Sequence, residues 1–236
     1  MKIDINCDLG EGIGNDAELM PYLDSCNIAC GGHFGDKDSM KEAIKLAKEY
    51  AVKVGAHPSF PDKQNFGRKI MKLSATELQN SLYQQIEDFS KVCEELNVEM
   101  HHIKLHGALY NLAANDPEVA AIVLNVFAAV KADIKIYVPY QSVIAMLADD
   151  YFPVVYEAFI DRRYHSDLSL VSRVNDNAVI TDIDEVWQQM SSIINDGQLK
   201  SVEGDLVAIK ADTFCLHGDE KNAVALVRHI RQCLCR

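Results

Sequence analysis

Residues 2–8 of this 236-residue chain read KIDINCD, a stretch in which polar and apolar side chains alternate strictly. Because successive residues of a β-strand point to opposite faces, the isoleucines and the cysteine share one face of this segment. The other face carries Asp4, Asn6 and Asp8. A strand of this kind is expected to pack under helices with its apolar face and to line a polar space with the other.

The same alternation recurs in four later segments, residues 52–57, 100–106, 154–160 and 206–212. Their polar faces carry His57, His102, Lys104, His106, Glu157, Lys210 and Asp212. Two further apolar runs, residues 26–31 and 135–138, complete a set of seven predicted strands.

Helical patterns lie between the predicted strands. They cover residues 36–50, 74–96, 117–131, 182–195 and 219–234. Asp36 can cap the first helix, and Ser74 with Glu77 forms a capping box at the start of the second. Strands that alternate with helices indicate an α/β protein with a mainly parallel sheet. We predict one domain over residues 1–236, because no linker or internal repeat interrupts the pattern.

The ionisable faces favour a closed barrel over an open sheet. A parallel sheet covered on both sides should read as nearly continuous Val, Ile and Leu. A seven-stranded (β/α) barrel whose mouth is a polar site explains the pattern better. In such barrels the carboxyl ends of all strands meet at one face, so Asp8, His57, His106 and Asp212 are expected there. A set of internal salt bridges without chemistry is the alternative.

The overall charge limits the partners. Lys and Arg number 23 and Asp and Glu 35, a net charge of −12, which argues against nucleic acid and anionic membrane surfaces. The seven cysteines are odd in number and scattered through apolar stretches, unlike a disulfide framework. Reduced thiols predict a cytoplasmic protein.

Three loops contain further candidate residues. The first reads NCDLGEGIG over residues 6–14 and includes Glu11, and His33 lies beside glycines in the second. Arg162 and Arg163 could grip a carboxylate or a phosphate together, or form a solvated pair. The sequence has no G-x-x-x-x-G-K-[ST] phosphate loop and no G-x-S-x-G nucleophile elbow.

Six motifs in order resemble the LamB/YcsF family of ATP-hydrolysing 5-oxoprolinase A subunits. They are NCDLGEGIG, NIACGGHFGD, GAHPSFPD with FGR, KLHGALYN, FIDRRY and ADTFCLHGD, and they span nearly the whole chain. The resemblance implies a seven-stranded (β/α) barrel similar to the glycoside hydrolase/deacetylase fold. It also implies cleavage of 5-oxo-L-proline to L-glutamate with ATP as co-substrate, and partner subunits B and C.

Residue types suggest roles in that reaction. The predicted catalytic residues are Asp8, His57, His106 and Lys104, and the first three could also hold a divalent metal ion. The predicted substrate- or phosphate-binding residues are Asn6, Glu11, His33, Arg162, Arg163 and Asp212.

Two other functions fit the same residues. One is a metal-dependent amidohydrolase or carbohydrate deacetylase that acts without ATP, and the other is a binding protein without catalysis. For either enzyme we expect His57 and His106 to lie close together with Asp8 in reach. We also expect Lys104 either to be held by a carboxylate, from Asp8 or Asp212, or to bind an anionic ligand. Leu105 is expected to face the helices.

Overall fold

The computed structural model describes residues 3–130, 133–148, 150–219 and 222–235. Lys2, Lys131 and residues 220–221, which the sequence placed in a strand and two helices, lie outside the described residues.

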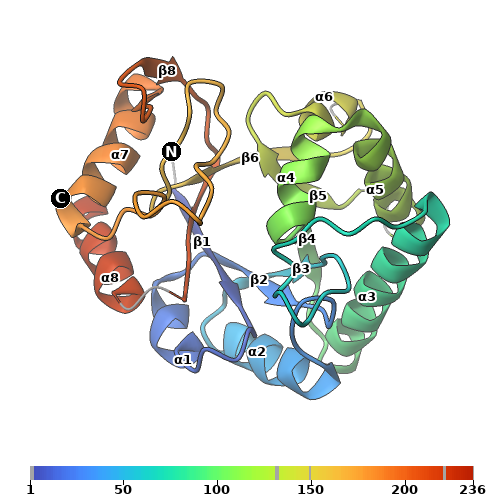
Figure 1. Cartoon of the computed structure of the whole chain (residues 1–236). Helices are drawn as coiled ribbons and strands as arrows, with labels where there is room; N and C mark the ends of the chain where they lie inside the picture. The colour runs from blue at the N-terminus through green and yellow to red at the C-terminus, as the bar shows by residue number, and fades with distance from the viewer. Residues whose placement is uncertain (1–2, 131–132, 149, 220–221, 236) are drawn as a thin grey trace.

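Seven parallel strands close into a barrel, in the order β1-β2-β3-β4-β5-β6-β9. They are β1 Asp4–Leu9, β2 Ser25–Ala29, β3 Lys53–His57, β4 Met100–Lys104, β5 Lys135–Pro139, β6 Val154–Phe159 and β9 Thr213–Leu216. Strand β9 pairs with both β6 and β1 and so closes the barrel. The predicted α/β class and seven-stranded barrel are confirmed (Figure 1).

The position of the seventh strand was predicted wrongly. Residues 206–212 do not form a barrel strand: β8 Leu206–Ala208 pairs antiparallel with β7 Gln198–Lys200 in a separate two-stranded sheet. The barrel strand is β9, whose four residues are too few to show alternation. Asp212 therefore precedes a strand instead of ending one.

Helices surround the barrel (Figure 1). They are α1 Asp16–Leu19, the 3₁₀ helix η1 Met20–Tyr22, α2 Lys37–Glu49, α3 Ala75–Glu95, α4 Gly107–Asn115, α5 Pro117–Val130, α6 Val143–Ala148, α7 Ile183–Asp196 and α8 Ala223–Leu234. Asp36 caps α2, and the Ser74–Glu77 capping box begins α3, as the sequence predicted. The short helices α1, α4 and α6 were not predicted.

The barrel interior is polar as the alternation predicted. Asn6 donates a hydrogen bond to Thr213 Oγ1 over 2.8 Å, and Asn27 donates to Asn6 Oδ1 over 2.8 Å. The ring of His102 donates to Asn27 Oδ1 over 2.7 Å and stacks on Tyr137. This network crosses the barrel below its mouth and satisfies polar groups that would otherwise be costly to bury.

A glycine makes room for that network. A Cβ atom at Gly55 would lie 2.1 Å from His102 Nε2, so only glycine allows the ring to sit inside the barrel here. The opposite strand faces form the core under the helices, where Ile5, Ile28 and Ile103 are fully buried.

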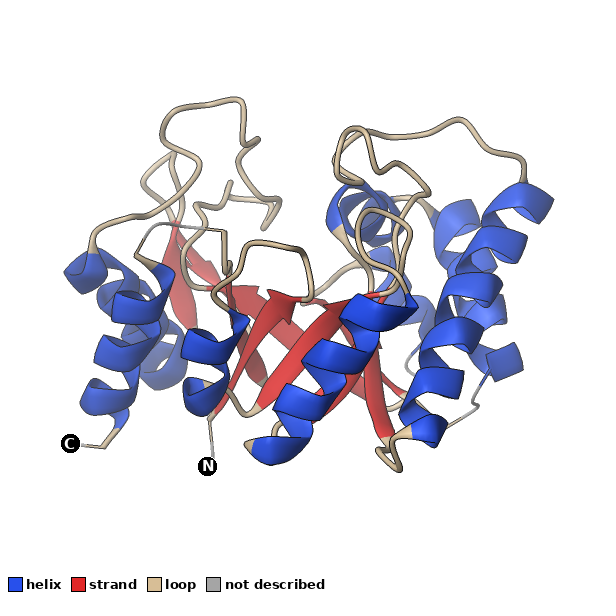
Figure 2. Ribbon diagram, turned by 90° about the horizontal axis from the view of Figure 1, so that it is seen from below, coloured by secondary structure: helices blue, strands red, loops and turns tan. Residues whose placement is uncertain are grey.

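The long loops gather at one end of the barrel, and both termini lie at the other (Figure 2). This is the end at which the parallel strands finish, as in other (β/α) barrels. Among the described residues no single helix is long and apolar enough to cross a bilayer; α4 and α5 pass that test only as a pair, bent by 114°.

Candidate active site

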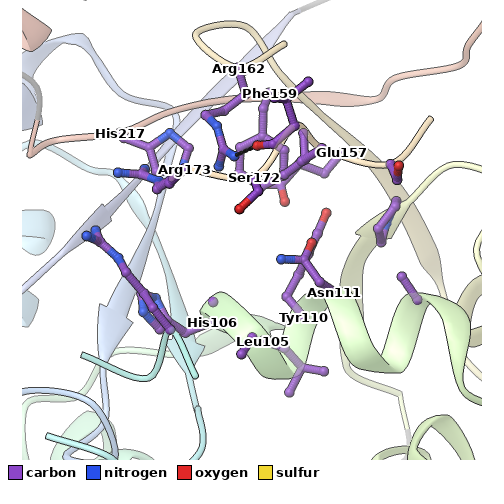
Figure 3. A pocket seen from close by; sticks show the side chains of 18 of the residues that line it. Leu105, His106, Tyr110, Asn111, Glu157, Phe159, Arg162, Ser172, Arg173 and His217 are labelled. Carbon is purple, nitrogen blue, oxygen red and sulfur yellow. Dashed lines mark hydrogen bonds between the residues drawn. The ribbon is translucent and has the colours of Figure 1, made fainter. Parts of the chain in front are cut away.

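A cavity of about 810 Å³ opens at the carboxyl ends of the strands. Figure 3 shows His106 and Asn111 on one side of it and Arg162, Arg173 and His217 across the open space. Six of the residues proposed from sequence line the cavity: Asp8, Glu11, His57, Lys104, His106 and Arg162.

Lys104 lies at the floor of the cavity between two carboxylates. Its Nζ is 2.9 Å from Asp8 Oδ1 and 2.9 Å from Glu157 Oε1, and its side chain is 1% exposed. Burial would lower the pKa of Lys104, but the nearby charges, Asp8 foremost, raise it well above its usual value. The lysine is therefore a permanent cation. The expected pairing with Asp8 is confirmed, and Glu157 takes the place predicted for Asp212.

His57 and His106 form a close pair beside Asp8, as expected. His57 Nε2 lies 3.0 Å from His106 Nδ1 and 3.2 Å from Asp8 Oδ2. The other nitrogen of each ring faces a backbone carbonyl, Lys104 O at 2.9 Å from His57 Nδ1 and Phe66 O at 3.0 Å from His106 Nε2.

Those carbonyls determine where the ring protons lie. A carbonyl oxygen can only accept, so His57 Nδ1 and His106 Nε2 must donate. When both rings are neutral, their remaining lone pairs point at each other over 3.0 Å. Such a contact needs an extra proton or a cation between the rings. A histidine whose outer N–H binds a backbone carbonyl is also typical of metal ligands.

Glu11 and His33 extend this group. Glu11 Oε1 lies 2.9 Å from His33 Nε2 and 3.5 Å from His106 Nδ1. Burial, with a smaller contribution from Asp8, raises the pKa of Glu11 to about 7. The His33 ring is fully buried and stacks on His106 with centroids 3.7 Å apart, and burial lowers its pKa to about 2.

Four residues, here named the histidine cluster, could hold a metal ion: Glu11, His33, His57 and His106. Each offers one ligand atom, and these atoms lie within 4.8 Å of one another. Imidazole nitrogens and a carboxylate oxygen suit zinc and similar divalent ions. The sequence proposed Asp8 as the carboxylate ligand; Asp8 is instead paired with Lys104, and Glu11 and His33 join the two histidines.

The cluster depends on Gly67, which has a left-handed φ of 63°. A Cβ atom there would lie 2.9 Å from His33 Cβ and 3.0 Å from His106 Cδ2. A larger residue would therefore push apart the two stacked rings as well as strain the turn.

The opposite side of the cavity comes from the segment after β6 and the residues after β9. We name this side the loop wall; it comprises Asp161, Arg162, Arg173 and His217. Arg162 is buried and donates to two backbone carbonyls, Val171 O at 2.6 Å and Ala178 O at 3.3 Å. Within the described part of the chain, no carboxylate lies in ion-pair distance of its guanidinium.

Arg173 shares its carboxylate with an arginine from another loop. Its Nη1 lies 3.2 Å from Asp219 Oδ2, and Arg68 Nη2 lies 2.6 Å from the same oxygen. With Arg162 and Asp161 there are three guanidinium groups and two carboxylates at this rim. The loop wall therefore carries an excess of positive charge in a protein of net charge −12.

Comparison with known proteins identifies the relationship. The profile of the LamB/YcsF family matches residues 3–236. The chain belongs to the LamB/YcsF family.

Named relatives of this LamB/YcsF protein match along almost their full length. It is 40% identical over 232 residues to the 5-oxoprolinase A subunit of Histophilus somni, covering 98% of this chain and 94% of the relative. It is 38% identical over 240 residues to the protein of the same name from Pyrococcus abyssi, covering 99% and 94%. The crystal structure of a lactam utilization protein from Thermus thermophilus superimposes with a TM-score of 0.91 at 35% identity, covering 99% of this chain and 96% of that one.

Four residues that the sequence proposed for the mouth of this LamB/YcsF barrel lie elsewhere or behind it. Arg163 points away and binds Glu185 of α7 with both nitrogens, at 2.5 and 2.9 Å. Asp212 is exposed at the opposite end of the barrel, where β9 begins. Asn6 lies deeper, in the interior network, and His33 is buried behind His106.

Leu105 is also placed differently. It was expected to face the helices, but it lines the cavity (Figure 3). Leu105 follows Lys104, the last residue of β4, so the alternation of the strand no longer applies to it.

Other residues of the mouth were missed. Arg68, Arg173 and Asp219 come from loops that carry no periodic signal. The sequence indicated Arg68 only through the FGR motif, which follows GAHPSFPD along the chain. His217 and Asp219 lie between β9 and the last helix, but α8 begins at Ala223 after Asn222, so neither caps it.

Proposed function

We propose that this chain is the catalytic subunit of an ATP-dependent 5-oxoprolinase, a hydrolase that opens the lactam of 5-oxo-L-proline to L-glutamate. One observation carries the proposal: the facing lone pairs of His57 and His106 lie at one side of a cavity whose far side holds arginines in excess of carboxylates. Base and anion site thus face each other across one small-molecule cavity. The names of the Histophilus and Pyrococcus relatives supply the substrate.

Hydrolysis of a lactam requires both a base and a site that binds anions. A lactam is a resonance-stabilised amide and a poor electrophile. Transfer of a phosphoryl group to its oxygen makes the ring carbon open to attack by water. A base must then take the proton of that water, and cations must hold the phosphoryl and carboxylate charges.

We assign proton transfer from water to the His57–His106 pair. Their protons are held at the backbone carbonyls of Lys104 and Phe66, which leaves the two lone pairs facing each other at the edge of the cavity, where one proton can be shared between them. Asp8 stabilises the positive charge that the pair gains, from 3.2 Å away. Lys104 keeps Asp8 ionised and in place, and Asn6 lies beneath its ammonium at 3.5 Å.

We assign binding of the substrate's anionic groups to Arg162 and Arg173. Arg162 has no carboxylate partner among the described residues, and Arg173 shares one with Arg68. A buried or half-buried guanidinium in this state gains most from a bidentate anion. Arg163 has no part in this assignment because Glu185 already satisfies it.

The histidine cluster fits a divalent metal ion by its donors. Glu11, His33, His57 and His106 would hold it, with the ion in place of the proton between His57 and His106, and it would then supply Lewis acidity at the mouth. The unshared lone pairs of His57 and His106 are the observation that favours an ion there.

ATP is the co-substrate of the assembly in this proposal. The chain has no phosphate loop of the Walker type, so we propose that subunits B and C take part in activating the lactam. We further propose a cytoplasmic location, since all seven cysteines are free thiols.

A second function is favoured by the same histidine cluster. A metal-dependent amidohydrolase or carbohydrate deacetylase would use these ligands without ATP. The two functions differ in their need for ATP and for partners.

The test is an assay with 5-oxoproline that follows glutamate, ADP and phosphate. We expect turnover only when this chain, its partner subunits and ATP are all present, with one phosphate per glutamate. Hydrolysis of an amide by the isolated chain without ATP, abolished by a chelator, would contradict the proposal and support the second function.

A further inference from the structure

His217 is a histidine of the loop wall that the roles assigned above do not use. Its Nδ1 lies 2.9 and 3.0 Å from the two oxygens of Asp161, whose Oδ2 also accepts the backbone N–H of His217 over 2.7 Å. Asp161 is buried, and the ring of Phe159 stacks on the imidazole with centroids 5.2 Å apart. The ring is thus fixed in position and in tautomer.

The other ring nitrogen, Nε2, is free to bind a ligand. No described residue forms a hydrogen bond with His217 Nε2, and His217 lines the cavity together with Asp8, Glu11 and His106. Figure 3 shows it across the open space from His106. A purely structural link between the segments after β6 and β9 would need neither a free Nε2 nor a place on this wall.

We propose that His217, oriented by Asp161, is the acid that protonates the ring nitrogen of the lactam as the carbon–nitrogen bond breaks. The inference rests on the proposed function and deepens it. A carboxylate that holds one imidazole nitrogen stabilises the imidazolium and directs its other N–H toward the substrate. His57 and His106 take the water proton from one side, and His217 gives a proton from the other.

The reaction itself requires this second group. Water adds to the phosphorylated lactam and gives a tetrahedral carbon that bears a hydroxyl, the phosphoryl oxygen and the ring nitrogen. If the bond to the phosphoryl oxygen breaks, phosphate leaves, the lactam reforms and the ATP has been spent without product.

If the carbon–nitrogen bond breaks instead, the hydroxyl oxygen forms the new carbonyl and releases its proton to water. The electron pair of the broken bond goes to nitrogen, which takes the proton from His217 Nε2. The product is glutamyl phosphate, which a second water hydrolyses to glutamate and phosphate. An acid placed at the nitrogen therefore decides between ring opening and futile loss of phosphate.

The experiment uses the full assembly with ATP and 5-oxoproline and compares wild type with His217→Asn. The asparagine amide can still donate to Asp161 from the position of Nδ1, but it lacks the group at Nε2. A second variant, Asp161→Asn, leaves the imidazole present but poorly oriented. His229→Asn on the outer helix α8 is the control, since it lies away from the mouth.

We expect His217→Asn to lower glutamate formation by about 100-fold or more, in the range typical for loss of a general acid. Phosphate release that depends on 5-oxoproline should fall much less, so the ratio of phosphate to glutamate rises well above one. Asp161→Asn should shift the ratio in the same direction, and His229→Asn should leave it at one.

A ratio of one in both loop-wall variants, or glutamate formation within threefold of wild type, would overturn the inference. Absence of ATP-dependent glutamate formation in the wild-type assembly would instead refute the proposed function, and this inference would fall with it. Melting curves of each variant separate loss of the acid from loss of folded protein.

Discussion

The two sides of the mouth hold their charges in different ways. The histidine cluster, with the Asp8–Lys104–Glu157 group below it, consists of side chains that pair with one another at the ends of β1, β3, β4 and β6. The loop wall holds Arg162 by backbone carbonyls and Arg173 by a carboxylate that it shares with Arg68.

The difference has an electrostatic consequence. Around Lys104 two carboxylates surround one ammonium, so the floor is negative and suits a cation or a proton. At the loop wall three guanidinium groups, of Arg68, Arg162 and Arg173, outnumber the carboxylates of Asp161 and Asp219, so that side suits an anion. One cavity thereby offers a site for proton transfer and a site for an anionic substrate, on opposite faces.

The largest expected effect concerns the floor. Lys104→Met leaves the buried charges of Asp8 and Glu157 uncompensated, and removal of one partner of a buried ion pair costs about 3 to 5 kcal/mol. We expect a large drop in the free energy of unfolding, measured by denaturant titration. The triple variant with Asp8→Asn and Glu157→Gln should recover part of that stability without any activity.

Lys53 is the matched control for Lys104. It also lies on a barrel strand and pairs with an aspartate, Asp4, at 3.1 Å, but its side chain is 49% exposed. Lys53→Met should cost no more than about 1 kcal/mol, as is usual for an exposed pair. Equal losses of unfolding free energy in Lys104→Met and Lys53→Met would show that Lys104 does not compensate the buried charges of Asp8 and Glu157.

The next effect concerns metal affinity of the histidine cluster. We expect the isolated chain to bind Zn²⁺ or Co²⁺, and His33→Asn to weaken binding by about 100-fold, since a ligand is lost. Calorimetric titration measures this, with His229→Asn as the control. Unchanged affinity in His33→Asn would favour the ligand set of Asp8, His57 and His106 that the sequence suggested.

A smaller effect distinguishes two arginines of the segment after β6. Arg173→Gln should raise the KM for 5-oxoproline about tenfold, equal to about 1.4 kcal/mol of lost anion binding, with a smaller change in kcat. Arg163→Gln should change KM less than twofold, because Glu185 holds that side chain outside the cavity. Equal changes in KM would contradict the anion site assigned to the loop wall.

The smallest effect is the pH dependence of the Asp161–His217 pair. Burial would raise the pKa of Asp161, but His217 outweighs it and lowers the pKa below the ordinary value of 3.8. The folded state therefore binds this proton less tightly than the unfolded state does. The resulting stability is complete above pH 3.8 and is lost as the pH falls toward the folded pKa.

Melting temperatures of wild type and Asp161→Asn should accordingly differ by a constant amount at neutral pH and converge below about pH 3.8. A difference that stays constant through this range would show that the charge of Asp161 does not contribute to stability.

The contrast between residues on strands and residues on loops also explains what the sequence could predict. His57, Lys104 and Asp8 lie on or at the ends of strands, where alternation fixes the face of each side chain, so their meeting at the mouth was predictable. Glu157 lay on the predicted polar face too, but the pattern gives no distances, and Asp212 was named beside Asp8 as a candidate partner of Lys104.

Loop residues follow no such rule. Arg162 and Arg163 are neighbours in sequence, yet the first faces the cavity and the second faces α7, because backbone bonds from Arg163 to Ala178 and Val171 fix the path of this segment. Arg173 reaches the mouth only through that path. The misplacement of Asp212 has a related cause, since a four-residue strand gives too little alternation to be located.

The central claim is that the mouth of this barrel opens the lactam. The most direct measurement is glutamate formation from 5-oxoproline and ATP by an assembly in which only this chain carries His57→Gln and the partner subunits are wild type. Our account predicts a loss of about 100-fold or more, with unchanged assembly and a normal melting curve. Glutamate formation at the wild-type rate would place the ring-opening step outside this cavity and contradict the account.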